Sequence, residues 1–115
     1  MATYQAIHNF AAHVKGDTWS GAQITIEVNS APLNLAGASI RATFRHPSCK
    51  KEYTLSTTNG DITITNGAGG VFKFDAAVID WASGTYVHDI EFTLSDGRVR
   101  TYIIGTFPIN EDTTD

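Results

Sequence analysis

Residues Thr85 to Phe107 read TYVHDIEFTLSDGRVRTYIIGTF, and this stretch decides the fold class. Apolar and polar residues alternate on both sides of Asp96 and Gly97, which is the pattern of strands that each have one buried face. The Asp-Gly pair suits the positive φ angles of a type I′ turn. The sequence therefore predicts a β-hairpin in which Thr85 to Leu94 pairs with Val99 to Phe107.

The turn also predicts the register of this hairpin, because a two-residue loop fixes which residues face each other. Gly105 then lies opposite His88, where the missing side chain leaves room for an inward imidazole. The expected inward pairs are Leu94 with Val99, Phe92 with Thr101, Ile90 with Ile103, His88 with Gly105 and Tyr86 with Phe107. The expected outward residues are Asp89, Glu91 and Thr93 against Ile104, Tyr102 and Arg100.

Short alternating segments occur along the rest of the chain, in residues 23–28, 40–45, 52–55 and 61–64. Turn-forming residues separate them, including the glycine-rich run from Asn66 to Gly70. Such regular strand spacing is typical of a β-sandwich or barrel. Two segments are less regular. Asp75 to Ser83 permits one helical turn, and Tyr4 to Phe10 is suited to a strand that adds to a sheet edge.

Length and charge limit the classes of function. At 115 residues the chain has the size of one domain with a single core. Its formal net charge of -4 opposes binding to nucleic acid or to an anionic membrane. The N-terminus lacks the pattern of a signal sequence, and no stretch approaches the ~20 apolar residues of a spanning helix. We therefore expect synthesis in a cytoplasm.

Cys49 is the single cysteine, so the chain has neither an internal disulfide nor a cysteine cluster for zinc. We interpret it as an inert thiol. The alternative is a reactive thiolate favoured by the ammonium groups of Lys50 and Lys51, but no base partner is identifiable.

Candidate catalytic residues are few. Asp89 and Glu91 share a strand face about 7 Å apart, which overlaps the carboxylate spacing of inverting glycosidases. Arg98 and Arg100 are expected to keep both groups anionic, so we favour surface ion pairs over hydrolysis. We predict no enzyme activity, cofactor or metal. The chain has four histidines, and their spacing is not that of metal ligands. They are His8, His13, His46 and His88.

Carbohydrate binding is an alternative function, because sugar rings stack on planar aromatic side chains. Trp19, Trp81 and Tyr102 are the candidate aromatic residues. Trp81 is expected to close one end of the core. Trp19 lies at the entry to the first regular strand, although large aromatic residues are usually buried.

Several segments between Lys15 and Phe107 together carry a family resemblance. They are residues 15–18 (KGDT), 33–38 (LNLAGA), 40–45 (IRATFR), 84–91 (GTYVHDIE) and 96–99 (DGRV), followed by Gly105. These segments resemble small β-sandwich domains of tailed bacteriophages, and the chain is similar to the N-terminal domain of siphophage baseplate upper proteins. The resemblance implies an immunoglobulin-like sandwich used as a virion building block, repeated around a symmetry axis and docked on tail, baseplate or capsid proteins.

The chain departs from that family in one respect. The family domain usually begins a longer chain with receptor-binding or fibre modules, whereas this sequence ends soon after its last predicted strand. We therefore expect an adaptor, decoration or connector role rather than host recognition.

The sequence thus predicts an all-β protein, namely a single immunoglobulin-like antiparallel β-sandwich of about 7–9 strands with at most one short helical turn. Residues 1–14 are expected to form an arm or edge strand, 15–109 the sandwich and 110–115 an acidic tail. We expect a non-enzymatic virion protein, made in the cytoplasm of a bacterial host, that forms a homo-oligomer and contacts other virion proteins. The expected contact residues for a partner or a glycan are Trp19, Tyr102, Arg41 and Arg45.

Overall fold

The computed structural model describes residues 6–28, 30–48 and 50–111 of the chain. Within these ranges the chain forms no helix, and its regular elements are all β-strands. The predicted all-β fold is therefore confirmed. Seven strands have four or more residues, and six have two. The strands are β1 (Ala6–Ile7), β2 (His13–Val14), β3 (Thr18–Trp19), β4 (Ala22–Thr25), β5 (Glu27–Val28), β6 (Ala31–Pro32), β7 (Ser39–Arg45), β8 (Glu52–Ser56), β9 (Ile62–Asn66), β10 (Val71–Phe74), β11 (Ala77–Val78), β12 (Gly84–Thr93) and β13 (Val99–Asn110).

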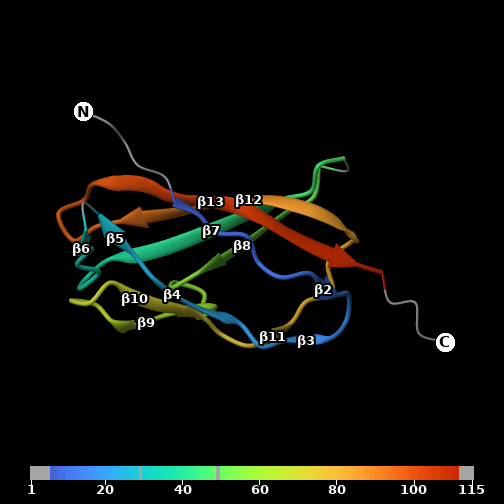
Figure 1. The fold of residues 1–115 in the computed structure, drawn as a ribbon, viewed down its shortest axis with the longest axis horizontal. Coiled ribbons are helices and arrows are strands. Elements are labelled where there is room, and N and C mark those ends of the chain that lie inside the picture. Colours follow the sequence, from blue (N-terminus) through green and yellow to red (C-terminus); the bar gives the residue numbers. More distant parts are fainter. Residues whose placement is uncertain (1–5, 29, 49, 112–115) are drawn as a thin grey trace.

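The strands form two layers that face each other across the core (Figure 1). One layer is a six-stranded sheet in the order β1-β13-β12-β7-β8, in which β2 also pairs with β13. The second layer contains the sheet β4-β10-β9 and, beside it, the ribbon of β11 and β3. A further ribbon of β5 and β6 lies at one end of the molecule. The arrangement is sandwich-like, as the strand spacing predicts.

A hydrogen bond of Tyr86 fixes the start of β12. Its hydroxyl donates to the carbonyl oxygen of Ala82 over 2.7 Å. A tyrosine near the start of this strand that bonds back to the upstream backbone is a feature of immunoglobulin-like sandwiches. In antibody domains the second disulfide cysteine follows that tyrosine by two residues. His88 has this position here, in a chain with only one cysteine.

β12 and β13 form the predicted hairpin, and the predicted register is correct from its open end as far as Ile90. Beyond Ile90 a β-bulge shifts the pairing, and the predicted partners of the later residues are wrong. The confirmed pairs are Tyr86 with Phe107, His88 with Gly105, Asp89 with Ile104 and Ile90 with Ile103. The shifted pairs are Glu91 with Thr101, Phe92 with Arg100 and Thr93 with Val99.

The turn explains this shift. The Gly97 N–H donates to the Leu94 carbonyl oxygen over 2.8 Å, and the Leu94 N–H donates to the Arg98 carbonyl oxygen over 2.8 Å. Of the loop residues only Gly97 has a positive φ, at 91°. The connection is therefore a three-residue loop with glycine in the left-handed region, and the predicted two-residue type I′ turn is wrong.

The helical turn that Asp75 to Ser83 permits is not formed. Ala77 pairs with Trp19 and Val78 with Thr18, so cross-strand partners take the main-chain groups that a helix would use. The Asp75 carboxylate, expected to cap the turn, instead accepts a hydrogen bond from the Thr63 hydroxyl over 2.9 Å.

The N-terminal segment forms one edge of the six-stranded sheet and runs parallel to β13, in agreement with the predicted edge strand. Ile7 pairs with Ile104, and the N–H groups of His8 and Phe10 donate to the Ile104 and Thr106 carbonyl oxygens over 2.8 and 2.9 Å. Tyr4 lies outside the described residues. At the other terminus Asn110 still belongs to β13, so the sheet reaches into the predicted acidic tail.

Aromatic side chains fill the space between the layers. Phe10 is 6% exposed and lies at the centre of the cluster, with its ring centroid 5.5 Å from that of Trp19 and 5.4 Å from that of Phe74. Trp81 is 8% exposed and stacks on Tyr53 at 4.4 Å between ring centroids, so it belongs to the core. Such rings bury large apolar areas, and this burial stabilises a core without a disulfide.

Candidate functional site

The outward side chains of the six-stranded sheet form the surface on which Arg41 and Arg45 lie. Along β12 the side chains alternate strictly between buried and outward positions. The pattern continues across the sheet, because Arg41 pairs with Glu91 and Arg45 with Val87 on the neighbouring strand. We call this surface the outer face.

Ion pairs bridge three strands of the outer face. The Arg41 Nη2 atom lies 2.8 Å from Glu91 Oε1, and the Arg45 Nη1 atom lies 2.8 Å from Asp89 Oδ2. The Arg45 Nε atom also lies 3.3 Å from Glu52 Oε2. The hydrogen bond with Asp89 is the main cause that raises the pKa of Arg45. Both predicted contact arginines are thus exposed but already paired.

The predicted arginine partners of Asp89 and Glu91 were Arg98 and Arg100, and this prediction is wrong. Arg98 instead pairs with Asp96 in the hairpin loop over 2.7 Å. The reason is the bulge, which shifts the end of β13 relative to β12. Contacts from the Arg98 backbone and side chain lower the pKa of Asp96.

Asp89 and Glu91 project from the same strand face, as predicted, and their side chains are 33% and 30% exposed. Each carboxylate accepts a hydrogen bond from an arginine of β7. Glycoside hydrolysis needs one of two such carboxyl groups in its protonated form. The geometry therefore gives the glycosidase hypothesis no support.

An apolar patch lies at the end of the outer face near the N-terminal edge. Ile7 is 71% exposed and Val87 is 50% exposed, and Ile104 lies beside Ile7 on the neighbouring strand. Together they border a depression of about 440 Å³ that Asn9 and Arg45 also line. We call Ile7, Val87 and Ile104 the outer patch. The patch was not predictable from the sequence, because Ile7 falls in a segment without a clear strand pattern.

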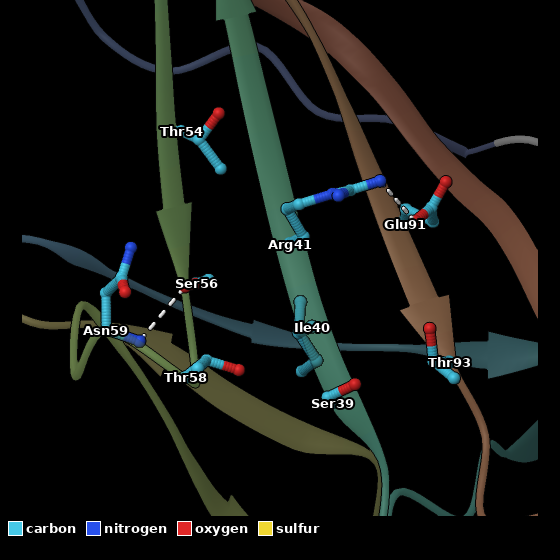
Figure 2. Close-up of a pocket in the computed structure, with 9 residues that line it drawn as sticks. All are labelled: Ser39, Ile40, Arg41, Thr54, Ser56, Thr58, Asn59, Glu91 and Thr93. Atoms are coloured by element: carbon cyan, nitrogen blue, oxygen red, sulfur yellow. Dashed lines mark hydrogen bonds and ion pairs between the residues drawn. The ribbon is translucent and has the colours of Figure 1, made fainter.

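A polar groove of about 330 Å³ lies at the opposite end of the outer face (Figure 2). Five residues with hydroxyl groups line it, together with the Arg41–Glu91 ion pair, and they are Ser39, Thr54, Ser56, Thr58 and Thr93. We call it the hydroxyl groove. Thr54 and Thr93 were predictable as outward residues from strand alternation, whereas Thr58 lies in the turn after β8. Their convergence depends on the order of β12, β7 and β8, which local patterns do not reveal.

The two candidate aromatic residues of the contact set lie elsewhere. Trp19 is 8% exposed and packs against Phe10 and Phe107, so it offers little surface to a sugar ring. Tyr102 was expected on the outer face opposite Glu91. It is instead the extra residue at the bulge, half-buried, with its ring centroid 5.8 Å from that of Phe92. The contact arginines and aromatics therefore do not form one site.

His88 is a packed histidine, as expected. Its side chain is 3% exposed, and its Nε2 atom lies 2.8 Å from the main-chain oxygen of His8. Its Nδ1 atom is buried and has no hydrogen-bond partner among the described residues. Burial lowers the pKa of His88, which favours the neutral imidazole. Cys49, the other reactive candidate, lies outside the described residues.

A cluster of metal ligands and a membrane-spanning helix are both absent from the described residues. In residues 6–28, 30–48 and 50–111, no three His, Cys, Asp or Glu side chains gather closely enough to hold a metal ion. The same ranges contain no helix with the length and apolar character needed to cross a membrane.

Comparison with known proteins leaves the family open. No protein-family model matches the chain, and no curated protein matches it.

Proposed function

We propose that the chain is a non-enzymatic assembly protein of a tailed-phage virion, and that the outer patch joins copies of it to one another. The observation that carries this proposal is the exposure of Ile7 and Val87 on strands that are paired within the six-stranded sheet. The segment resemblance to phage baseplate domains supports the virion setting. In this account the chain is made in the cytoplasm of a bacterial host and ends in the virion.

The size of the outer patch suits repeated, individually weak contacts. Removing a valine or isoleucine side chain from water stabilises a contact by roughly 1.5–3 kcal/mol. One patch of three such residues therefore gives a modest interface, but a ring of copies multiplies weak contacts into stable attachment. A virion component that is present in many copies satisfies this condition.

The charges beside the outer patch favour specific contacts. Arg45 and Asp89 line the same depression as Val87 and carry opposite charges. A neighbouring copy placed over this surface can pair each charge with the opposite one, which contributes to the register of the contact more than to its affinity. Homo-oligomers use self-complementary surfaces of this kind.

Sedimentation velocity tests this proposal with the purified chain at several concentrations. We expect a defined oligomer, and Val87→Glu should dissociate it because the new carboxylate loses its water in the contact. Thr25→Glu is the matched control, since Thr25 is exposed on β4 in the opposite layer. An oligomer that Val87→Glu leaves intact, or a monomer at every concentration, would contradict self-assembly through the outer patch.

A further inference from the structure

The hydroxyl groove, which the assembly proposal does not use, has the chemistry of a binding site. Side chains from three adjacent strands and from the turn after β8 converge on it (Figure 2). Its volume of about 330 Å³ lies at the lower end of the range for small-molecule sites. We propose that this groove binds a neutral saccharide.

Four of the five hydroxyl groups of the groove are available to a ligand, since that of Ser56 already accepts a hydrogen bond. Those of Ser39, Thr54, Thr58 and Thr93 have no hydrogen-bond partner within the described part of the chain. A hydroxyl group both donates and accepts hydrogen bonds. Four such groups around one depression match a ligand that itself carries several hydroxyl groups, because each sugar hydroxyl can donate to one neighbour and accept from another.

The Arg41–Glu91 pair adds charged hydrogen-bonding groups on one wall. A single contact of 2.8 Å joins Arg41 Nη2 to Glu91 Oε1, so Glu91 Oε2 and the other guanidinium N–H groups are able to bind a ligand. A carboxylate accepts from two adjacent sugar hydroxyls, and a guanidinium donates to ring or hydroxyl oxygens. Hydrogen bonds to charged groups are stronger than those between neutral groups.

Other classes of small ligand fit the groove less well. An anion would meet Glu91 beside the only cationic side chain of the lining, and the chain has a net charge of -4. An apolar ligand would find Ile40 as its single apolar lining residue, which is 1% exposed. A neutral polyhydroxylated molecule avoids both penalties.

Internal hydrogen bonds hold the turn that closes the groove. The Ser56 hydroxyl accepts from the Asn59 N–H over 3.1 Å, and the Thr57 hydroxyl accepts from the Ile40 N–H over 3.1 Å. The Ser56 N–H in turn donates to the Asp61 carboxylate over 3.2 Å. A turn fixed in this way places Thr58 and Asn59 before a ligand arrives, which reduces the entropy cost of binding.

The groove and the outer patch are separate sites on one face. Val87 in the patch and Thr93 at the groove are six residues apart on β12, which is about 20 Å along a strand. Saccharide binding therefore does not depend on self-assembly through the patch. Among the described residues no aromatic ring lines the groove, so we expect no stacking on a sugar ring and an affinity in about the millimolar range.

Two-dimensional NMR of the labelled chain tests the inference by titration with glucose, galactose and N-acetylglucosamine. We expect saturable shifts of the amides of Ser39, Arg41, Thr54 and Thr93 with at least one of these sugars. Thr93→Val keeps the shape of the side chain and removes its hydroxyl, and it should weaken binding about fivefold. Glu91→Gln should weaken it about tenfold or more.

Thr85→Val is the matched control, because Thr85 is an exposed threonine of the same strand outside the groove. It should leave the affinity unchanged. Absence of saturable shifts with all three sugars would overturn the proposal. Tighter binding of N-acetylneuraminic acid or inorganic phosphate at the same residues would overturn the neutral class of ligand. Equal weakening by Thr85→Val would overturn the assignment to the groove.

Discussion

The Nε2 atom of His88 lies 2.8 Å from the main-chain oxygen of His8, a residue eighty positions earlier in the chain. With Nε2 protonated the ring donates to this carbonyl, and the hydrogen bond ties the N-terminal edge segment to the middle of β12. Gly105 makes the contact possible. A Cβ atom there would press against the His8 carbonyl oxygen and lie 2.9 Å from His88 Nε2.

We expect Gly105→Ala to displace the N-terminal segment. The added methyl group has no room between the His8 backbone and the His88 ring, so the free energy of unfolding should fall by about 1–3 kcal/mol. Hydrogen exchange should also become faster at the amides of His8 and Phe10. Val99→Ala is the control, because Val99 lies on the same strand and is 49% exposed. Unchanged exchange at both amides would contradict this account of Gly105.

The free energy of unfolding is expected to decrease as the pH falls below about 6.5. Burial lowers the pKa of both His88 and His8 from the ordinary value of 6.5, so the unfolded chain takes up protons before the folded chain does. This contribution to stability is fully present above pH 6.5 and is lost as the pH falls towards the lowered pKa values. Each unit of pKa difference is worth about 1.4 kcal/mol.

Urea denaturation at about pH 8 and about pH 5 measures this dependence. His88→Gln provides the comparison, because its amide can still donate to the His8 carbonyl but does not titrate. The decrease should be smaller in this variant. Identical pH dependence in both proteins would show that His88 does not contribute.

Loss of the Tyr86 hydroxyl should weaken the corner at the start of β12. Tyr86→Phe removes the donor of the 2.7 Å hydrogen bond and leaves the Ala82 carbonyl without it. We expect a loss of about 1 kcal/mol in the free energy of unfolding. Tyr53→Phe is matched to it, because the Tyr53 hydroxyl has no hydrogen bond among the described residues. Thermal denaturation should separate the two variants, and equal melting temperatures would refute the role of the corner.

Trp19 should affect stability rather than ligand binding. The residue is 8% exposed and its ring centroid lies 5.2 Å from that of Phe107. Trp19→Ala opens a cavity in the aromatic cluster and should cost about 3–5 kcal/mol of stability. Chemical denaturation monitored by the fluorescence of Trp81 measures the loss. A cost below about 1 kcal/mol would place Trp19 outside the core.

The strands with regular alternation were predictable because a two-residue period depends only on which face is buried. The inward set of β12, from Tyr86 to Ile90, and its partners on β13 follow from this rule. The length of the loop was not predictable in this way, since Asp-Gly is compatible with both two- and three-residue hairpin connections. One residue more in the loop, compensated by the bulge at Tyr102, preserved the inward pairs from Tyr86 to Ile90 but changed the partners of Glu91 and Phe92.

Contacts between distant segments were not predictable from local pattern. Nothing in the sequence around Arg41 indicates that β7 lies beside β12, so the partners of Asp89 and Glu91 were assigned to the hairpin instead. The hydroxyl groove depends on the same neighbour relation. Ile7 illustrates a different limit, because a two-residue strand is too short to show a period.

Mass spectrometry of gradient-purified particles tests the proposed virion role most directly, with particles of a phage whose genome is found to encode the chain. We predict that the chain is present in a fixed ratio to the other tail or capsid proteins, at several copies per particle. Its absence from particles, with the chain found only in the soluble fraction of the infected host, would contradict the assembly role.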